Sequence, residues 1–121
     1  MERFSEVTGE EGVATLRWLD DVAPDLGRYV VEWGYADVYS RPGLDLQRRQ
    51  IATLAALVTQ GGAEAQLRIH IAAALRLGLD PREIVEIILQ CLPFTGFPRV
   101  LNATGVAREV FAAEGIDDLQ G

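Results

Sequence analysis

The chain has 121 residues, of which 49% are apolar and 24% are charged, a balance ordinary for one globular domain. Its formal net charge of -7, without any basic run, argues against nucleic acid as a partner because an acidic surface repels phosphate backbones. All eleven cationic side chains are arginine, which excludes Schiff-base chemistry on a lysine amine.

Cysteine content and hydropathy narrow the class of protein further. The single cysteine, Cys91, can form neither an internal disulfide nor a redox pair, and it cannot supply a cysteine-rich zinc site. No apolar run is long enough to cross a membrane, and the first residues lack the apolar core of a signal peptide. We therefore expect one domain over residues 1–121, located in the cytoplasm, with no membrane and no nucleic acid among its partners.

Turn and capping signals divide the chain into helices. A weakly patterned helix is predicted over residues 12–22, and a second from Pro24 over residues 24–39, because proline suits a first helical turn. The Pro-Gly pair in residues 40–43 ends it. Asp45 can cap a third helix, which the glycine pair at 61–62 ends.

Three further helices are predicted in the second half of the chain. One contains the only histidine and stops at Gly78. Asp80, Pro81 and Glu83 then form a capping box before a helix that is apolar around much of its circumference and is interrupted at residues 92–98. The last helix covers about residues 98–113, with a frayed tail at 116–121. No strand pattern persists, so the predicted fold is all-α, with five to six helices.

His70 is predicted to face inward on its helix. At about 100° per residue, Glu64, Arg68 and Arg76 form the solvent-exposed face of this helix. His70 lies about 180° from the middle of that face. A core histidine bonded to a carbonyl is one interpretation. Neighbouring alanines that leave space, and Gln66 one turn earlier to orient the ring, favour acid–base use instead. A lone histidine makes a poor metal site, so no metal is expected.

Several other side chains are candidates for a binding site. Arg49 is either a solvated residue or a bidentate partner for a substrate carboxylate. Trp33, Tyr35 and Tyr39 share one helix and either line a pocket or pack in the core. Asn102 is either a pocket amide or a packing contact.

An ordered set of short motifs carries a resemblance to a known family. The matching segments are Tyr39-Ser40-Arg41-Pro42-Gly43-Leu44-Asp45, Arg49-Gln50-Ile51-Ala52-Thr53-Leu54-Ala55, Gln66-Leu67-Arg68-Ile69-His70, Gly78-Leu79-Asp80-Pro81-Arg82-Glu83-Ile84-Val85-Glu86, Gly96-Phe97-Pro98 and Asn102-Ala103. Over about residues 25–113 the chain resembles the carboxymuconolactone decarboxylase family.

The resemblance implies an all-α fold shared with alkylhydroperoxidase D-type proteins, and a homo-oligomer, commonly a trimer or hexamer. Members of that wider group often carry a CxxC motif before the histidine. Ala63 and Gln66 stand where those cysteines would fall, so peroxidase chemistry of that kind is not expected.

The resemblance also implies a reaction. The namesake enzyme is a carboxy-lyase that needs no cofactor and converts γ-carboxymuconolactone to the 3-oxoadipate enol-lactone in aromatic catabolism. His70 matches the family histidine and is the expected proton donor or relay, and Arg49 matches a family arginine that would hold a substrate carboxylate. Gln66 replaces a glutamate, and Phe94 a tyrosine, that decarboxylase-type members tend to have.

Two other functions stay open. The Gln66 and Phe94 departures favour a noncatalytic, oligomeric protein whose pocket binds a lactone or aromatic acid. The scaffold could also serve isomerisation or ring chemistry in another pathway. The candidate site comprises His70 as the catalytic group and, for substrate binding, Arg49, Gln66, Trp33, Tyr39, Phe94 and Asn102.

Overall fold

The computed structural model describes residues 1–117 and 119, and within these the chain is helical throughout, without a strand. The helices are α1 (Glu2–Asp20), α2 (Pro24–Tyr29), the π-helix η1 (Val30–Val38), α3 (Leu46–Gln60), α4 (Glu64–Arg76), α5 (Pro81–Thr95) and α6 (Phe97–Ala113). Six α-helices confirm the all-α prediction. Residues 118, 120 and 121 of the tail predicted to fray lie outside the described part.

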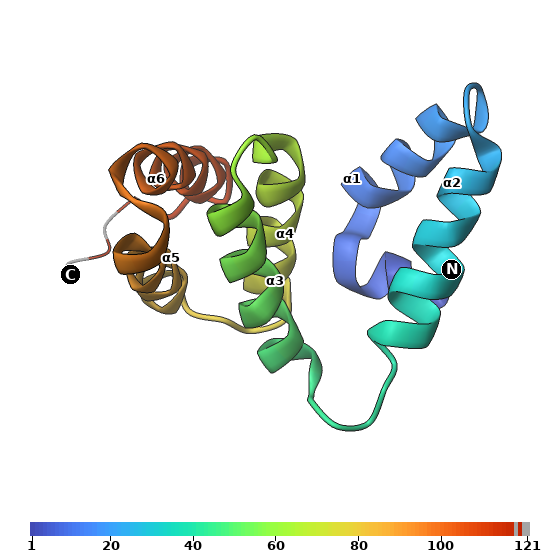
Figure 1. The fold of residues 1–121 in the computed structure, drawn as a ribbon, viewed down its shortest axis with the longest axis horizontal. Coiled ribbons are helices and arrows are strands. Elements are labelled where there is room, and N and C mark those ends of the chain that lie inside the picture. The colour runs from blue at the N-terminus through green and yellow to red at the C-terminus, as the bar shows by residue number, and fades with distance from the viewer. Residues whose placement is uncertain (118, 120–121) are drawn as a thin grey trace.

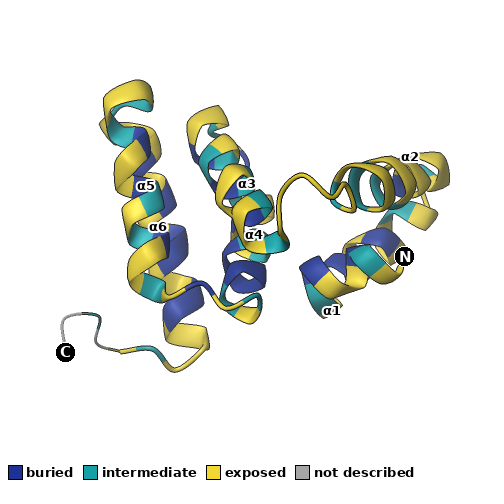
Figure 2. Cartoon of the chain, turned by 90° about the horizontal axis from the view of Figure 1, so that it is seen from below, coloured by how far each residue is buried: buried dark blue, intermediate teal, exposed yellow. Residues whose placement is uncertain are grey.

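Helices α3 to α6 form the body of the molecule, and their buried residues run along the sides that face one another (Figure 2). Leu54, Ile71 and Ile84 are essentially inaccessible to solvent and join α3, α4 and α5 in one core. Helices α1, α2 and η1 form a separate N-terminal arm, joined to α3 by a loop (Figure 1). The arm packs on the body through α1, which lies against α4, and tyrosine side chains at η1 also reach α3 and α4.

The first helix begins earlier than the sequence pattern predicts. The predicted range of residues 12–22 is wrong at its start, because α1 spans Glu2–Asp20. The helix contains a break at Gly9. Gly9 has a φ of +67°, a conformation that only glycine adopts without strain. The guanidinium of Arg76 packs against this glycine and donates to the carbonyl of Val7 (2.8 Å). The break therefore bends α1 onto α4.

Most predicted helix ends are confirmed. Asp45 caps α3 by accepting from the backbone N–H of Arg48, and Asp80 with Glu83 forms the capping box of α5. The predicted interruption at residues 92–98 is narrower than expected. Helix α5 runs through Pro93 to Thr95, although this proline has no N–H to donate to the carbonyl of Leu89 one turn earlier.

Candidate functional site

The body and the arm meet at His70, in the middle of α4. The imidazole is half-buried, and hydrogen-bond partners lie at both of its nitrogens. Nδ1 is 3.0 Å from the amide nitrogen of Gln50 on α3, and Nε2 is 3.0 Å from the hydroxyl of Tyr35 on η1. Three helices distant in sequence therefore converge on one ring.

Gln50 is the polar residue that α3 buries among apolar ones. It is fully buried and shares one face of α3 with Leu54 and Val58, at a spacing of four residues. Its amide nitrogen also donates to the backbone carbonyl of His70 (2.8 Å), and its amide oxygen accepts from the hydroxyl of Tyr39 (3.3 Å). A buried amide with all these partners holds its orientation, because turning it would leave buried polar atoms unpaired.

The π-helix η1 and its C-cap residue supply Tyr35 and Tyr39 to the site. Bonding to the fifth residue along, as from Tyr39 to the carbonyl of Gly34, widens each turn, so side chains four apart stand nearly above one another. The rings of Tyr35 and Tyr39 are stacked with centroids 4.7 Å apart, and Phe4 of α1 meets Tyr35 edge-on at 4.9 Å. Aromatic contacts thus fix the ring that faces His70.

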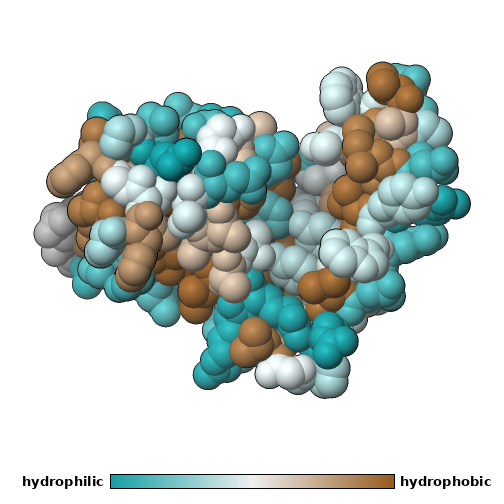
Figure 3. Space-filling model, viewed as in Figure 1, coloured by the Kyte–Doolittle hydropathy of each residue, from teal (hydrophilic) through white to brown (hydrophobic). Residues whose placement is uncertain are grey.

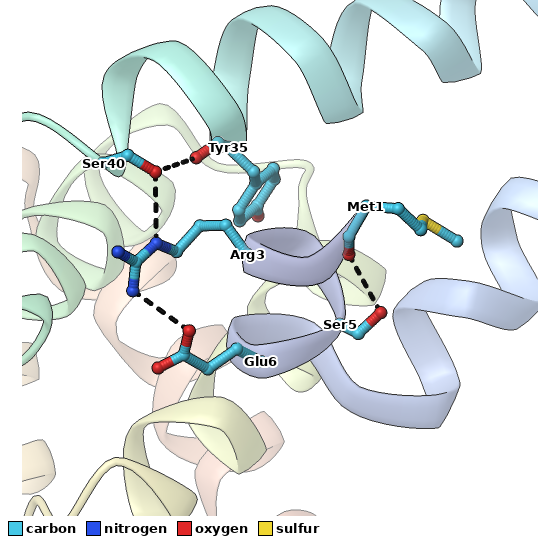
Figure 4. A network of polar contacts seen from close by, with 6 residues as sticks. All are labelled: Met1, Arg3, Ser5, Glu6, Tyr35 and Ser40. Atoms are coloured by element: carbon cyan, nitrogen blue, oxygen red, sulfur yellow. Dashed lines mark hydrogen bonds and ion pairs between the residues drawn. The ribbon is translucent and has the colours of Figure 1, made fainter.

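Polar contacts secure the end of η1 to α1 (Figure 4). Ser40 donates to the backbone carbonyl of Tyr35 (3.1 Å) and accepts from Nε of Arg3 (3.2 Å), whose guanidinium also pairs with Glu6. These bonds lie on the backbone side of Tyr35 and leave its hydroxyl to His70. They therefore hold the arm in the position that places Tyr35 on the imidazole.

Arg49 lies at the edge of this cluster. Its guanidinium donates to the carbonyls of Leu44 (3.1 Å) and Arg41 (2.7 Å), and Thr53, one turn along α3, hydrogen-bonds the hydroxyl of Tyr39. The hydroxyl of Thr53 also donates to the backbone carbonyl of Arg49 (3.0 Å), and the positive charge of Arg49 lowers the pKa of Tyr39 against the larger effect of burial. Two of the five guanidinium N–H groups are committed to the loop, and the others can bind an anion.

Burial sets the protonation states at the centre. It lowers the pKa of His70 to about 4, assisted by the positive charge of Arg76. Burial also raises the pKa of Tyr35 and, despite opposing effects from Thr53 and Arg49, that of Tyr39. At neutral pH the site therefore contains a neutral imidazole and neutral phenols. Such groups can donate and accept hydrogen bonds without any net charge at the centre.

The structure brings some of the sequence candidates together and not others. Tyr39 and His70 belong to one hydrogen-bonded network, with Arg49 beside it. Gln66 is exposed, and the amide that orients the imidazole is Gln50 instead. Trp33 is 69% exposed although it is two residues from Tyr35, since side chains two apart point to opposite sides of a helix.

Phe94 and Asn102 also lie apart from the network. Phe94, at the end of α5, is 80% exposed. Asn102 on α6 lines a separate cavity of about 390 Å³ beside the turn between α3 and α4, together with Arg99 and Glu64. Among the described residues, no hydrogen bond links either side chain to His70. The alanines expected to leave space are packed instead, as Ala73 is wholly buried where neighbouring helices meet α4.

The fold and the site define an all-α protein with a neutral histidine, a tyrosine and an amide linked in one polar network. The chain belongs to the carboxymuconolactone decarboxylase family, whose model matches residues 24–109. It is 35% identical over 117 residues to a 4-carboxymuconolactone decarboxylase of Acinetobacter baylyi, a match that covers 96% of this chain and 87% of that protein.

Two further relatives extend the comparison. An uncharacterised 15.0 kDa protein of Paracoccus denitrificans is 34% identical over 82% of this chain and 75% of its own. A nitrosuccinic acid decarboxylase of Metarhizium robertsii is 31% identical over 66% of this chain and 55% of its own. The predicted family and enzyme class, a carboxy-lyase of the decarboxylase type, are thereby confirmed. None of the described helices is long and apolar enough to cross a membrane.

Proposed function

We propose that the protein is a cofactor-free decarboxylase of a small carboxylated lactone, with γ-carboxymuconolactone as the first substrate to test. The observation that carries this proposal is the polar network on His70, set in a chain that matches a named 4-carboxymuconolactone decarboxylase over nearly its whole length. The reaction product would be the 3-oxoadipate enol-lactone.

The reaction needs an electron acceptor and a proton, and the substrate itself supplies the first. As the bond from carbon to the carboxylate breaks, CO2 leaves and its bonding electrons pass into the unsaturated lactone, giving a dienolate. A proton must then reach carbon. His70 is the proposed centre of that proton delivery, because its half-buried ring is hydrogen-bonded on both nitrogens and is excluded from bulk solvent on most sides.

Arg49 is the proposed anchor of the substrate carboxylate. It lies beside Tyr39 at the rim of the network and keeps N–H groups that the loop does not use. An Arg49→Lys substitution retains the charge and loses the planar pair of donors. The proposal predicts a KM raised about 10-fold or more with kcat changed less; a KM unchanged in the Arg49→Lys and Arg49→Ala variants would contradict the anchor role.

A homo-oligomer, a trimer or hexamer, is part of the proposal. Large apolar side chains remain uncovered in one chain at the junction of α5 and α6, where Phe97 is 67% and Leu101 65% exposed, and on the arm, where Trp33 is 69% exposed. Figure 3 shows that hydrophobic residues reach the surface of both the body and the arm. Trp33, Gln66, Phe94 and Asn102 would then join a substrate site only from a second copy or after closure around the substrate. Light scattering behind a sizing column measures this: a monomer at micromolar concentration contradicts it.

A substrate panel tests the reaction itself. CO2 release is measured from γ-carboxymuconolactone and from nitrosuccinic acid, because the two relatives with an activity in their names are decarboxylases of these different kinds of acid. Release from the lactone supports the proposed substrate class, and release only from nitrosuccinic acid corrects the substrate but keeps the reaction. Binding of lactones or aromatic acids without any CO2 release would instead favour the noncatalytic alternative.

A further inference from the structure

The hydrogen bonds around His70 specify which ring nitrogen carries the proton. The backbone carbonyl of His70 can only accept a hydrogen bond, so the group of Gln50 that lies 2.8 Å from it must be the amide NH2. The amide oxygen then faces Tyr39, whose hydroxyl can donate to it. Because Gln50 is fully buried, no water is at hand to stabilise the opposite orientation.

The same NH2 group lies 3.0 Å from Nδ1 of His70. One of its hydrogens serves the carbonyl and the other points at Nδ1, so Nδ1 must be the acceptor and carries no hydrogen. In a neutral ring the hydrogen therefore sits on Nε2. An imidazolium would put a second N–H against the Gln50 amide, donor against donor, and Gln50 thus opposes protonation of the ring.

The hydroxyl of Tyr35 is the partner of Nε2. Since Nε2 carries the hydrogen, it donates to the Tyr35 oxygen over 3.0 Å. The hydrogen of the phenol must then point away from His70, and the structure offers it no acceptor among the described residues. The stacked Tyr39 ring and the edge of Phe4 hold this phenol in place. The Tyr35 hydroxyl is thus held in one position, and its hydrogen is available to a substrate.

We propose that Tyr35 is the catalytic group that gives the proton to the substrate carbon, and that Gln50 is a positioning residue that keeps His70 in the Nε2–H form behind it. This inference rests on the proposed decarboxylase function. As CO2 leaves, the Tyr35 O–H bond breaks and its proton forms a C–H bond with the dienolate, leaving a phenolate. The Nε2–H of His70 stabilises that phenolate, and a proton from water then restores the phenol.

Protonation states agree with this assignment of roles. Burial lowers the pKa of His70 to about 4, so few rings carry a second proton at neutral pH. Burial raises the pKa of Tyr35, so the phenol keeps its proton at neutral pH and can donate it when the dienolate forms next to it. The neutral phenol of Tyr35 is also compatible with an anionic substrate held at Arg49. It adds no second positive charge that would compete with Arg49 for the substrate carboxylate.

The first experiment measures the tautomer without any need for activity. The chain has one histidine, so a 15N-labelled sample gives one pair of imidazole nitrogens in a long-range 1H–15N spectrum. At pH 7 the proposal predicts a protonated Nε2 and an unprotonated Nδ1. In a Gln50→Glu variant the new carboxylate accepts, so Nδ1 should gain a proton. A wild-type spectrum with the proton on Nδ1, or with both nitrogens protonated, would overturn the role of Gln50.

The second experiment separates Tyr35 from the chain's other phenols. Tyr35→Phe removes one hydroxyl and keeps the aromatic packing, and Tyr29→Phe is the matched control because Tyr29 is exposed on α2. With a substrate that the wild type decarboxylates, Tyr35→Phe should lower kcat roughly 100-fold or more with KM little changed, whereas Tyr29→Phe should leave both. Equal kcat values in the wild type and Tyr35→Phe would overturn the catalytic role.

The two experiments also distinguish failure of the inference from failure of the function. A wild type that releases no CO2 from any substrate of the panel contradicts the proposed function, and the proton-delivery step falls with it. The imidazole spectrum still decides whether Gln50 sets the tautomer, since it depends only on the folded protein. Circular dichroism of each variant establishes that a loss of turnover is not a loss of fold.

Discussion

Acidification tests the electrostatic description of His70 quantitatively. Burial and the charge of Arg76 lower the pKa of this ring from an ordinary 6.5 to about 4 in the folded protein. Between pH 6.5 and pH 4 the histidine therefore binds a proton in the unfolded chain but not in the folded chain. The free energy of unfolding falls as the pH falls towards 4. At about 1.4 kcal/mol for each factor of ten in proton affinity, the loss between pH 7 and pH 4 is roughly 3 kcal/mol.

The measurement compares the wild type with His70→Gln. Urea unfolding followed by far-ultraviolet circular dichroism gives the free energy of unfolding of each protein at pH 7 and pH 4, at one protein concentration. Carboxylates titrate in both proteins, so the difference between them isolates His70. The wild type should lose about 3 kcal/mol more than the variant over this interval. An equal loss in the two proteins would refute the lowered pKa of His70.

Four predictions of stability follow from single positions, each measured by the same urea unfolding. Gly9→Ala should cost roughly 1–2 kcal/mol, because its φ is +67° and the new Cβ would lie 2.9 Å from the Arg76 guanidinium, and an unchanged midpoint would contradict the argument. Gly105→Ala, in the interior of α6 with open space around it, should instead stabilise by about 0.5–1 kcal/mol. Asp80→Ala removes the capping-box acceptor and should cost about 1 kcal/mol; a loss below a few tenths would show that the box contributes little. Leu54→Ala should cost roughly 2–5 kcal/mol, since the side chain is 1% exposed, and a smaller value would mean that the core collapses onto the cavity.

Helix ends were the most predictable part of the fold. Asp45, the pair Asp80 and Glu83, and Gly61 act through neighbours within four residues, so the local sequence is enough to predict them. The start of α1 was not predictable in the same way. Its first half is helical because it packs on α4, with Arg76 against Gly9, and that contact joins residues 67 positions apart.

The site was predictable in part. His70 could be placed inward from the helical repeat alone, and Tyr39 from its spacing on a helix. Gln50 could have been found from its spacing, because it is a polar residue four and eight positions before the buried Leu54 and Val58. The sequence alone could not show that Tyr35, and not Trp33, faces the site. That outcome depends on which side of η1 lies against α4 in the folded chain.

CO2 release from γ-carboxymuconolactone by the wild type and by His70→Gln tests the central claim most directly. Both proteins are first shown to be folded by circular dichroism, and initial rates are then compared at saturating substrate. The account predicts turnover in the wild type and a loss of roughly 100-fold or more in the folded variant, because the phenolate of Tyr35 loses its Nε2–H donor. Equal turnover in the two proteins would contradict the claim that the network on His70 is the active site.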